Sequence, residues 1–167
     1  SNFTFLTGAS HPEELMGRAH ELGMAALAIA DANSVAGIVR AHVAAREIAR
    51  TLGAAPRLIP AALLRLEGGL VLTALPRDRA GWGRLCRLLS LGRLRAPKGE
   101  CRLTAADLAD WAEGMELLLH PGAAEDAGWM AQARALLPRL PAGRTALLMA
   151  PAYDGQDAAR FAGLARL

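Results

Sequence analysis

Two polar side chains stand where short apolar runs end, which is where α/β proteins hold their functional groups. Asp31 follows the apolar run 25–30, and His120 follows the run 115–119. A carboxylate and an imidazole at the carboxyl ends of parallel strands are typical ligands for a divalent metal that activates water. Each also has a plainer explanation, Asp31 as a turn or helix-capping residue and His120 as part of the turn His120-Pro121-Gly122. We favour the plainer explanation for both.

The remaining candidates for acid, base or ligand roles have weaker patterns. His11 lies at a predicted helix start, and His20 and His42 lie on predicted helices. Asp107 and Asp110 are spaced i, i+3 on a short predicted helix, which indicates a solvated face. The sequence contains no nucleophile elbow, phosphate-binding glycine loop or HExxH motif.

A basic segment, residues 77–102, is a candidate of a different kind. It carries eight basic side chains against only Asp78 and Glu100. Guanidinium groups contact phosphate and give a weak, salt-dependent affinity for nucleic acid. The alternatives are a solubilising helix face and a surface that docks acidic neighbours. The basic residues are Arg77, Arg79, Arg84, Arg87, Arg93, Arg95, Lys98 and Arg102.

Apolar periodicity predicts helices and strands that alternate along the chain. Ser10-His11-Pro12-Glu13 has the S-x-x-E pattern of a capping box, and Asn33 or Ser34 is expected to cap the second helix. The run 25–30 lacks polar alternation, which is typical of a parallel strand covered on both faces. The predicted helices span 11–22, 34–50, 78–94, 104–114, 126–137 and 155–167. The predicted strands span 25–30, 57–59, 63–66, 70–75, 115–119 and 145–149, with a hairpin at Gly68-Gly69.

This alternation implies an α/β fold with a parallel sheet and right-handed crossovers. About five βα units are visible, fewer than a closed eight-fold barrel requires. In the second helix, one apolar stripe is expected to face the core. It consists of Val35, Ile38, Val39, Val43 and Ile48.

The composition is that of a folded, single-domain chain in the cytoplasm. Hydrophobic residues make up 53% of the 167 residues, and the net charge of +3 is carried almost wholly by arginine. We expect no membrane partner, because no apolar run approaches the roughly 18 residues of a span. The first residues also lack a signal-peptide pattern. Cys86 and Cys101 lack CxxC spacing, so neither a disulfide framework nor a zinc site is expected.

Four motifs follow one another at a specific spacing within the first 110 residues. They are Ser1 to Leu15, Asp31-Ala32-Asn33-Ser34 through His42, Asp78 to Ser90, and Lys98-Gly99-Glu100-Cys101. A fifth and weaker one is Tyr153-Asp154-Gly155-Gln156-Asp157. Together they resemble the amino-terminal PHP (polymerase and histidinol phosphatase) domain of bacterial C-family DNA polymerases, and most closely that of the error-prone branch.

The resemblance implies a PHP-type distorted (β/α) barrel. With about five βα units and one hairpin, these residues would form an incomplete barrel. It also implies that 1–167 is a single PHP-like domain in the amino-terminal part of a larger chain. That parent chain would be a nucleotidyltransferase, carrying out DNA-directed DNA synthesis in damage-induced, translesion repair. Its catalytic carboxylates and magnesium would lie outside this fragment.

The resemblance further implies that the metal site of this PHP domain is degenerate. Working PHP domains bind metal through a His-x-His pair, an Asp-His pair, a later Glu, a further His and a last Asn-Asp-Val-His-like motif. The His-x-His pair would precede Ser1 and the last motif would follow Leu167. At the positions between them, Asp31 is kept, and the residues that match the two other His and the Glu are Ala32, the segment Ala61-Ala62-Leu63-Leu64, and Ala152. We therefore expect no catalytic, metal-binding or cofactor-binding residue in this fragment, and a structural, positioning role. The implied partners are the remainder of the polymerase chain, DNA through the basic segment, and other repair-polymerase subunits. The alternative is an active metal-dependent phosphoesterase or a 3′ to 5′ proofreading exonuclease.

Overall fold

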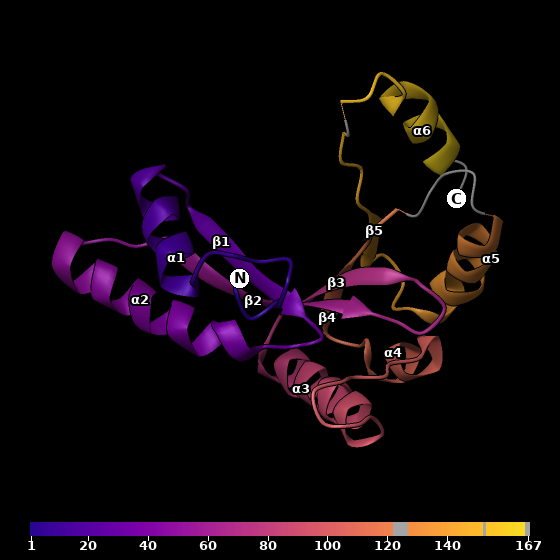
Figure 1. Cartoon of the computed structure of the whole chain (residues 1–167), viewed down its shortest axis with the longest axis horizontal. Coiled ribbons are helices and arrows are strands. Elements are labelled where there is room, and N and C mark those ends of the chain that lie inside the picture. The colour runs from indigo at the N-terminus through magenta and orange to yellow at the C-terminus, as the bar shows by residue number, and fades with distance from the viewer. Residues whose placement is uncertain (122–126, 152, 166–167) are drawn as a thin grey trace. The chain divides into compact units, whose positions relative to one another are not determined.

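The computed structural model describes residues 1–121, 127–151 and 153–165 (Figure 1). These residues form two compact units, Ser1–Leu63 and Leu64–Leu167. The boundary between the units falls inside strand β2 (Arg57–Arg65). No helix among these residues has both the length and the apolar character needed to cross a membrane.

The first unit packs two helices on a pair of parallel strands. Strand β1 (Ala26–Ala32) pairs with β2 in parallel, with Ala26 opposite Arg57 and Ala32 opposite Leu63. Helices α1 (Pro12–Glu21) and α2 (Ala36–Leu52) pack on each other, and both contact β1 (Figure 1). The core between these elements is apolar. It includes Met16, Ala19, Ile29, Ile38, Ala41, Ala61 and Ala62.

The starts of both helices differ from the prediction by one or two residues. Helix α1 begins after His11, whose backbone N–H donates to the Glu14 carboxylate at 2.8 Å, so the expected Ser10 box is shifted by one residue. Glu13 is instead engaged by Arg40. Helix α2 begins after Val35, which has no side-chain cap bond. The Ala36 N–H donates to the Ser34 hydroxyl at 3.1 Å, so the predicted residue Ser34 still contacts the start of this helix.

Helix α2 ends at Leu52, two residues after the predicted end at Arg50, and its buried face is narrower than expected. Gly53 follows the helix with φ of 82°, the left-handed conformation that ends many helices. Ile38 is buried, whereas Val39 is 70% and Val43 is 60% exposed. The prediction that these two valines face the core is wrong, because α1 and the strands cover only the opposite side of the helix.

The second unit contains the end of β2 together with strands β3, β4 and β5. Strand β3 (Val71–Pro76) pairs antiparallel with β4 (Met115–Leu119), and β4 pairs in parallel with β5 (Thr145–Leu147). A turn precedes β3, in which the Leu66 N–H donates to the Leu70 carbonyl at 2.9 Å. Gly68 and Gly69 take φ of 90° and 97° in this turn, so the predicted diglycine turn is confirmed. The two strands predicted at 57–59 and 63–66 are one continuous strand, β2.

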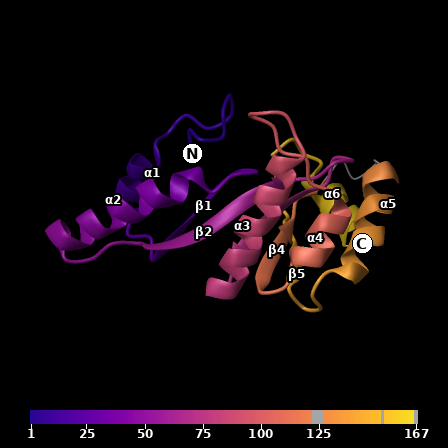
Figure 2. The same cartoon turned by 90° about the horizontal axis from the view of Figure 1, so that it is seen from below.

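The helices of this unit follow the predicted order. Helix α3 (Arg79–Leu94) packs on β3 and on α4 (Ala105–Trp111), and the two helices lie side by side in Figures 1 and 2. They are followed by α5 (Ala127–Leu136), a 3-10 turn (Leu137–Arg139) and α6 (Asp157–Leu164). The expected helix ends at Asp126 and Leu167 lie outside the described residues.

The α/β class predicted from the sequence is confirmed. The described strands form one five-stranded sheet in the order β1-β2-β3-β4-β5, and this sheet does not close into a barrel. Apolar burial holds the strands of the second unit to its helices. The fully buried side chains include Leu72, Leu85, Leu88, Leu103, Leu108, Met115 and Leu117.

Candidate functional site

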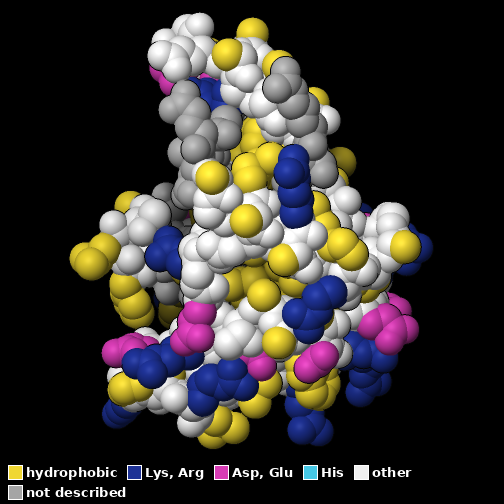
Figure 3. Space-filling view, turned by 90° about the vertical axis from the view of Figure 1, so that its right-hand side faces the viewer, with side chains coloured by type: hydrophobic (Ala, Val, Ile, Leu, Met, Phe, Trp, Pro, Cys, Tyr) yellow, Lys and Arg dark blue, Asp and Glu magenta, His cyan; other side chains and the backbone are white. Residues whose placement is uncertain are grey.

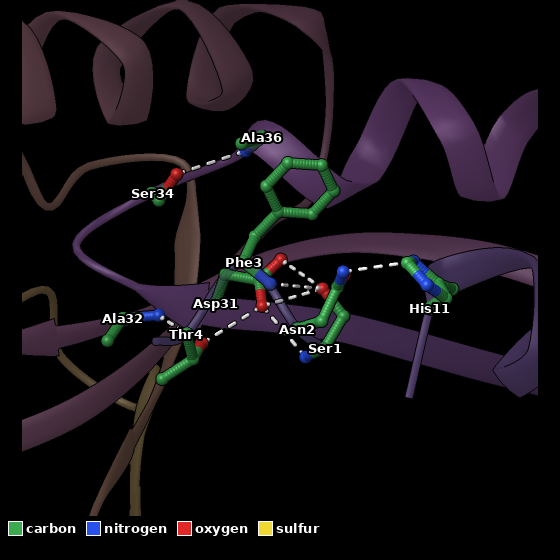
Figure 4. Close-up of polar contacts among 9 residues, drawn as sticks. All are labelled: Ser1, Asn2, Phe3, Thr4, His11, Asp31, Ala32, Ser34 and Ala36. Carbon is green, nitrogen blue, oxygen red and sulfur yellow. Dashed lines mark hydrogen bonds and ion pairs between the residues drawn. The ribbon is translucent and has the colours of Figure 1, made fainter. Parts of the chain in front are cut away.

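Asp31 is the centre of a buried polar network at the carboxyl end of β1 (Figure 4). The residue is 1% exposed. Its Oδ1 accepts hydrogen bonds from the Ser1 hydroxyl at 2.8 Å and the Thr4 hydroxyl at 2.9 Å. The Ser1 hydroxyl also lies 2.9 Å from Oδ2. Thr4 Oγ1 in turn accepts from the Ala32 N–H at 3.0 Å, so the network fastens the first loop to the end of the strand.

This environment keeps Asp31 ionised. Burial of the carboxyl opposes ionisation, but the hydrogen bonds that Ser1 and Thr4 donate to it outweigh this effect. They hold the pKa of Asp31 below its usual range. An ionised carboxylate only accepts hydrogen bonds, and here both of its oxygens already have donors from the protein. Asp31 therefore has a structural role, in which it binds the first loop to the end of β1. The sequence interpretation of Asp31 as a turn or helix-capping residue is wrong in this respect.

The loop that carries these donors, residues 1–10, has further anchors. Asn2 Nδ2 lies 2.9 Å from His11 Nδ1, and the Asn2 N–H donates to the Ser10 carbonyl at 2.8 Å. The Arg40 guanidinium lies 5.9 Å from the centre of the Phe3 ring, within the range of a cation–π contact. The loop is thus tied to β1, α1 and α2.

Gly37 in α2 provides the space for the Asp31 carboxylate. A Cβ at position 37 would lie 2.5 Å from Asp31 Oδ2 and 2.9 Å from Ser1 Oγ. Any side chain at this position would displace the network. Sequence reasoning missed Gly37, Ser1 and Thr4, because no periodic or motif signal connects them to Asp31.

The residues beside Asp31 at which we looked for metal ligands in the sequence are apolar. In the strand register, Asp31 lies opposite Ala62, and Ala32 lies opposite Leu63. Ala61 and Ala62 are fully buried. Ala152, the third expected position, lies outside the described residues. Within the part of the chain that the structure describes, no three His, Cys, Asp or Glu side chains gather as a metal site would require.

His120 ends β4, as predicted, and belongs to the second unit. Its backbone N–H donates to the Val71 carbonyl at 2.9 Å, and its Nε2 lies 2.8 Å from Thr73 Oγ1. Burial lowers the pKa of His120, which favours the neutral imidazole. These contacts fit a strand-end residue that is satisfied by its neighbours.

Cys86 and Cys101 are free thiols. Burial raises the pKa of both, so the unreactive protonated form dominates at neutral pH.

Asp107 has a different role from the solvated one predicted for it. It is 9% exposed, and its Oδ2 accepts from the Thr104 N–H at 2.8 Å and the Thr104 hydroxyl at 2.8 Å. The Arg95 guanidinium binds both carboxylate oxygens, at 2.6 and 3.0 Å. Burial opposes ionisation, yet the bonds from Thr104 and Arg95 lower the pKa of Asp107. The carboxylate therefore closes a capping box at the start of α4.

Much of the basic segment is engaged in ion pairs. Arg77 lies 3.2 Å from the Glu116 carboxylate, Arg84 lies 3.3 Å from Glu113, and Arg102 lies 3.8 Å from Glu100. Arg95 is held by Asp107 as described above. These contacts reduce the positive charge that the segment presents to a partner.

Seven of the eight basic residues of the segment are exposed, including Arg79, Arg87 and Lys98. For Arg79, Arg87 and Lys98 the described residues provide no ion-pair partner. Figure 3 shows one face of the molecule, on which Lys and Arg side chains are separated by acidic and hydrophobic ones. That face carries no continuous basic patch.

The comparison with known families agrees with this fold and identifies the class of protein. The PHP domain profile matches residues 1–144, and the chain therefore belongs to the PHP domain family. It is 42% identical to an error-prone DNA polymerase of Ruegeria pomeroyi, across 100% of this chain and 18% of that protein. It is 43% identical to an error-prone DNA polymerase of Rhodopseudomonas palustris, across 100% of this chain and 15% of that protein. The chain thus spans less than a fifth of the length of these relatives.

A solved structure has the same kind of fold. It is a Bifidobacterium adolescentis protein described as a metal-dependent phosphoesterase, with a TM-score of 0.62. The alignment covers 95% of this chain and 79% of that one, at 13% sequence identity. At this identity the likeness concerns the fold alone.

Proposed function

We propose that this chain is a degenerate, non-catalytic PHP module of an error-prone C-family DNA polymerase, in which it stabilises and positions the polymerase chain. The observation that carries this proposal is the engagement of Asp31. Among the predicted ligand positions within these residues, the one acid retained, Asp31, uses both oxygens to hold its own loop, beside Ala32 and Leu63. Metal-assisted hydrolysis requires several carboxylate or imidazole groups that converge on one ion. The residues present here do not fit such an ion.

The relatives support the assignment to a polymerase. Both are named error-prone DNA polymerase, and both are several times longer than this chain. In the proposal, residues 1–167 form one PHP-like domain of such a protein, and DNA synthesis in translesion repair takes place outside them. The protein acts in the cytoplasm, and its partners include other repair-polymerase subunits.

A nuclease assay tests the non-catalytic role directly. The 167-residue chain and the full-length polymerase would be incubated with a labelled primer or a model phosphate ester, together with Mg²⁺, Mn²⁺ or Zn²⁺. Asp31→Asn serves as the matched variant, because it keeps the shape of the side chain and removes the charge. We expect no release of nucleotide or phosphate that depends on Asp31, and well under one metal ion per chain by elemental analysis of the 167-residue protein.

The alternative function makes the opposite prediction. Hydrolysis that requires Mn²⁺ or Zn²⁺ and disappears in Asp31→Asn would establish a metal-dependent phosphoesterase or exonuclease. A tightly bound equivalent of metal in the 167-residue chain would also contradict the proposed role.

We propose a second, weaker function for the basic segment, which is contact with the DNA backbone. The exposure of Arg79, Arg87 and Lys98 supports it. A triple glutamine variant of these residues is expected to lower affinity equally for all DNA sequences. It should also reduce the slope of log affinity against log salt by about 2–3, or 0.7–0.9 per phosphate contact. Arg50→Gln is the control, since Arg50 is paired with Glu47. An unchanged slope in the triple variant would assign the segment to solubility.

A further inference from the structure

A groove of about 530 Å³ lies along α1 and α2 in the first unit. Gly17 from α1 and Ala44 from α2 line it, and both are small residues. A Cβ at Gly17 would meet no atom within 4 Å, so nothing in the first unit fills the space above this glycine. The apolar side chains that line the groove are Val39, Val43 and Ile48.

Val39 and Val43 lie one turn apart on α2, on the same face. They are 70% and 60% exposed, although valine side chains gain free energy when they leave water. An exposed apolar row beside a groove is typical of a surface that contacts another protein segment.

The charged residues at this groove neutralise one another. Glu13 from α1 is paired with Arg40 from α2 at 2.5 Å, and Glu47 is paired with Arg50 at 2.6 Å. A surface with an apolar centre and paired charges around it favours an apolar occupant over a charged one. Because the groove is formed by two helices whose backbone groups are bonded internally, an occupant can add only side-chain contacts. An amphipathic helix satisfies this condition.

We propose that an amphipathic helix from the part of the same polymerase chain outside residues 1–167 docks in this groove. The inference rests on the proposed function, in which these residues are a module of a longer polymerase. The relatives provide the reason for choosing this occupant over a separate protein, since 82% and 85% of their length (100 − 18 and 100 − 15) lies outside the matched region. A helix within the same chain is present at high effective concentration and docks at little entropic cost.

Cysteine labelling of the full-length polymerase tests the docking. Val43→Cys reports on the groove, and Leu52→Cys is the matched control, because Leu52 lies on the same helix, is 63% exposed and does not line the groove. Alkylation by N-ethylmaleimide would be followed by peptide mass spectrometry, which separates these sites from Cys86 and Cys101. We expect Val43→Cys to react about tenfold more slowly than Leu52→Cys, because it reacts only when the helix undocks.

Gly17 offers a way to displace the occupant. Gly17→Asp places a charge in the groove without a steric clash in the first unit, and it should bring labelling of Val43→Cys to the control rate. Gly17→Ala should leave the protection in place. Equal labelling of Val43→Cys and Leu52→Cys in the unmodified background would overturn the proposal whether or not the Gly17 variants fold.

The remaining outcomes separate this inference from the proposed function. Primer extension by the same preparation with an unprotected Val43→Cys would refute the docked helix and leave the polymerase assignment intact. Protection without primer extension would support docking and contradict the polymerase assignment. Protection that increases with protein concentration would assign the groove to a second copy of the chain and refute the proposal.

Discussion

Replacing Asp31 by alanine is expected to lower the free energy of unfolding by about 3–5 kcal/mol. A hydrogen bond to a charged group contributes about 1.5–3 kcal/mol, and the Ser1 and Thr4 hydroxyls both lose such an acceptor. The expected loss is smaller than twice the upper value for one such bond. The reason is that the first loop can move toward water, where the two freed hydroxyl donors are hydrated. Asp31→Asn keeps one acceptor oxygen and should have an intermediate effect.

The contribution of Asp31 to the free energy of unfolding depends on pH in a direction that follows from its pKa. The pKa of Asp31 in the folded chain lies below the ordinary value of 3.8, so just below pH 3.8 the unfolded chain binds more protons. Stability in that window therefore rises with pH. The contribution is fully present above pH 3.8 and is lost as the pH falls through the folded pKa. The stability difference between the unmodified chain and Asp31→Ala should be constant at neutral pH and shrink in acid.

Urea unfolding followed by far-ultraviolet circular dichroism is the appropriate assay. Tryptophan fluorescence is unsuitable, because Trp82, Trp111 and Trp129 all belong to the second unit. Asp110→Ala is the control and should change stability by no more than about 0.5 kcal/mol, since Asp110 is exposed. A loss of only about 0.5–2 kcal/mol for Asp31→Ala is the range of a helix cap, and would refute the network role.

Two further changes probe the second unit. Gly81→Ala should destabilise by about 1–3 kcal/mol in urea unfolding, because its Cβ would lie 2.2 Å from the Gly114 carbonyl oxygen. Gly83→Ala in the same helix has open space and should stabilise by about 0.5–1 kcal/mol, so equal effects of the two would contradict the packing. Asp107→Ala should cost about 2–3 kcal/mol, mainly from the lost cap with a smaller part from the half-exposed Arg95 pair. If hydrogen exchange shows that α4 is as stable in this variant as in the unmodified chain, the capping role of Asp107 would be contradicted.

The elements with local signals could be predicted well from sequence. Helix α3 begins after Asp78, whose side chain accepts from the Gly81 N–H at 2.8 Å, and α4 begins after Thr104. Both caps are set by residues within one turn of the helix, and a sequence pattern can capture them. The strand 115–119 was predicted with the observed bounds for the same reason.

Roles that depend on distant residues could not be predicted in the same way. The donors to Asp31 are 27 and 30 residues away, so its pattern resembled that of a turn residue. Asp107 was misinterpreted because the i, i+3 spacing to Asp110 concealed its partnership with Arg95. Val39 and Val43 were expected in the core because apolar side chains generally favour burial. Whether they are buried, however, depends on which elements pack against that face of the helix.

The close approach of Gly37 to Asp31 makes the effects of substitutions at these two positions interdependent. While the carboxylate is present, a Cβ at position 37 would lie 2.5 Å from it, so alanine at this position is strongly disfavoured. After Asp31 becomes alanine, that obstacle is gone, and the cost of Gly37→Ala should fall. The two substitutions are therefore non-additive, with the double variant less destabilised than the sum of the single ones. The relief is partial, because Ser1 Oγ would still lie 2.9 Å from a Cβ at position 37.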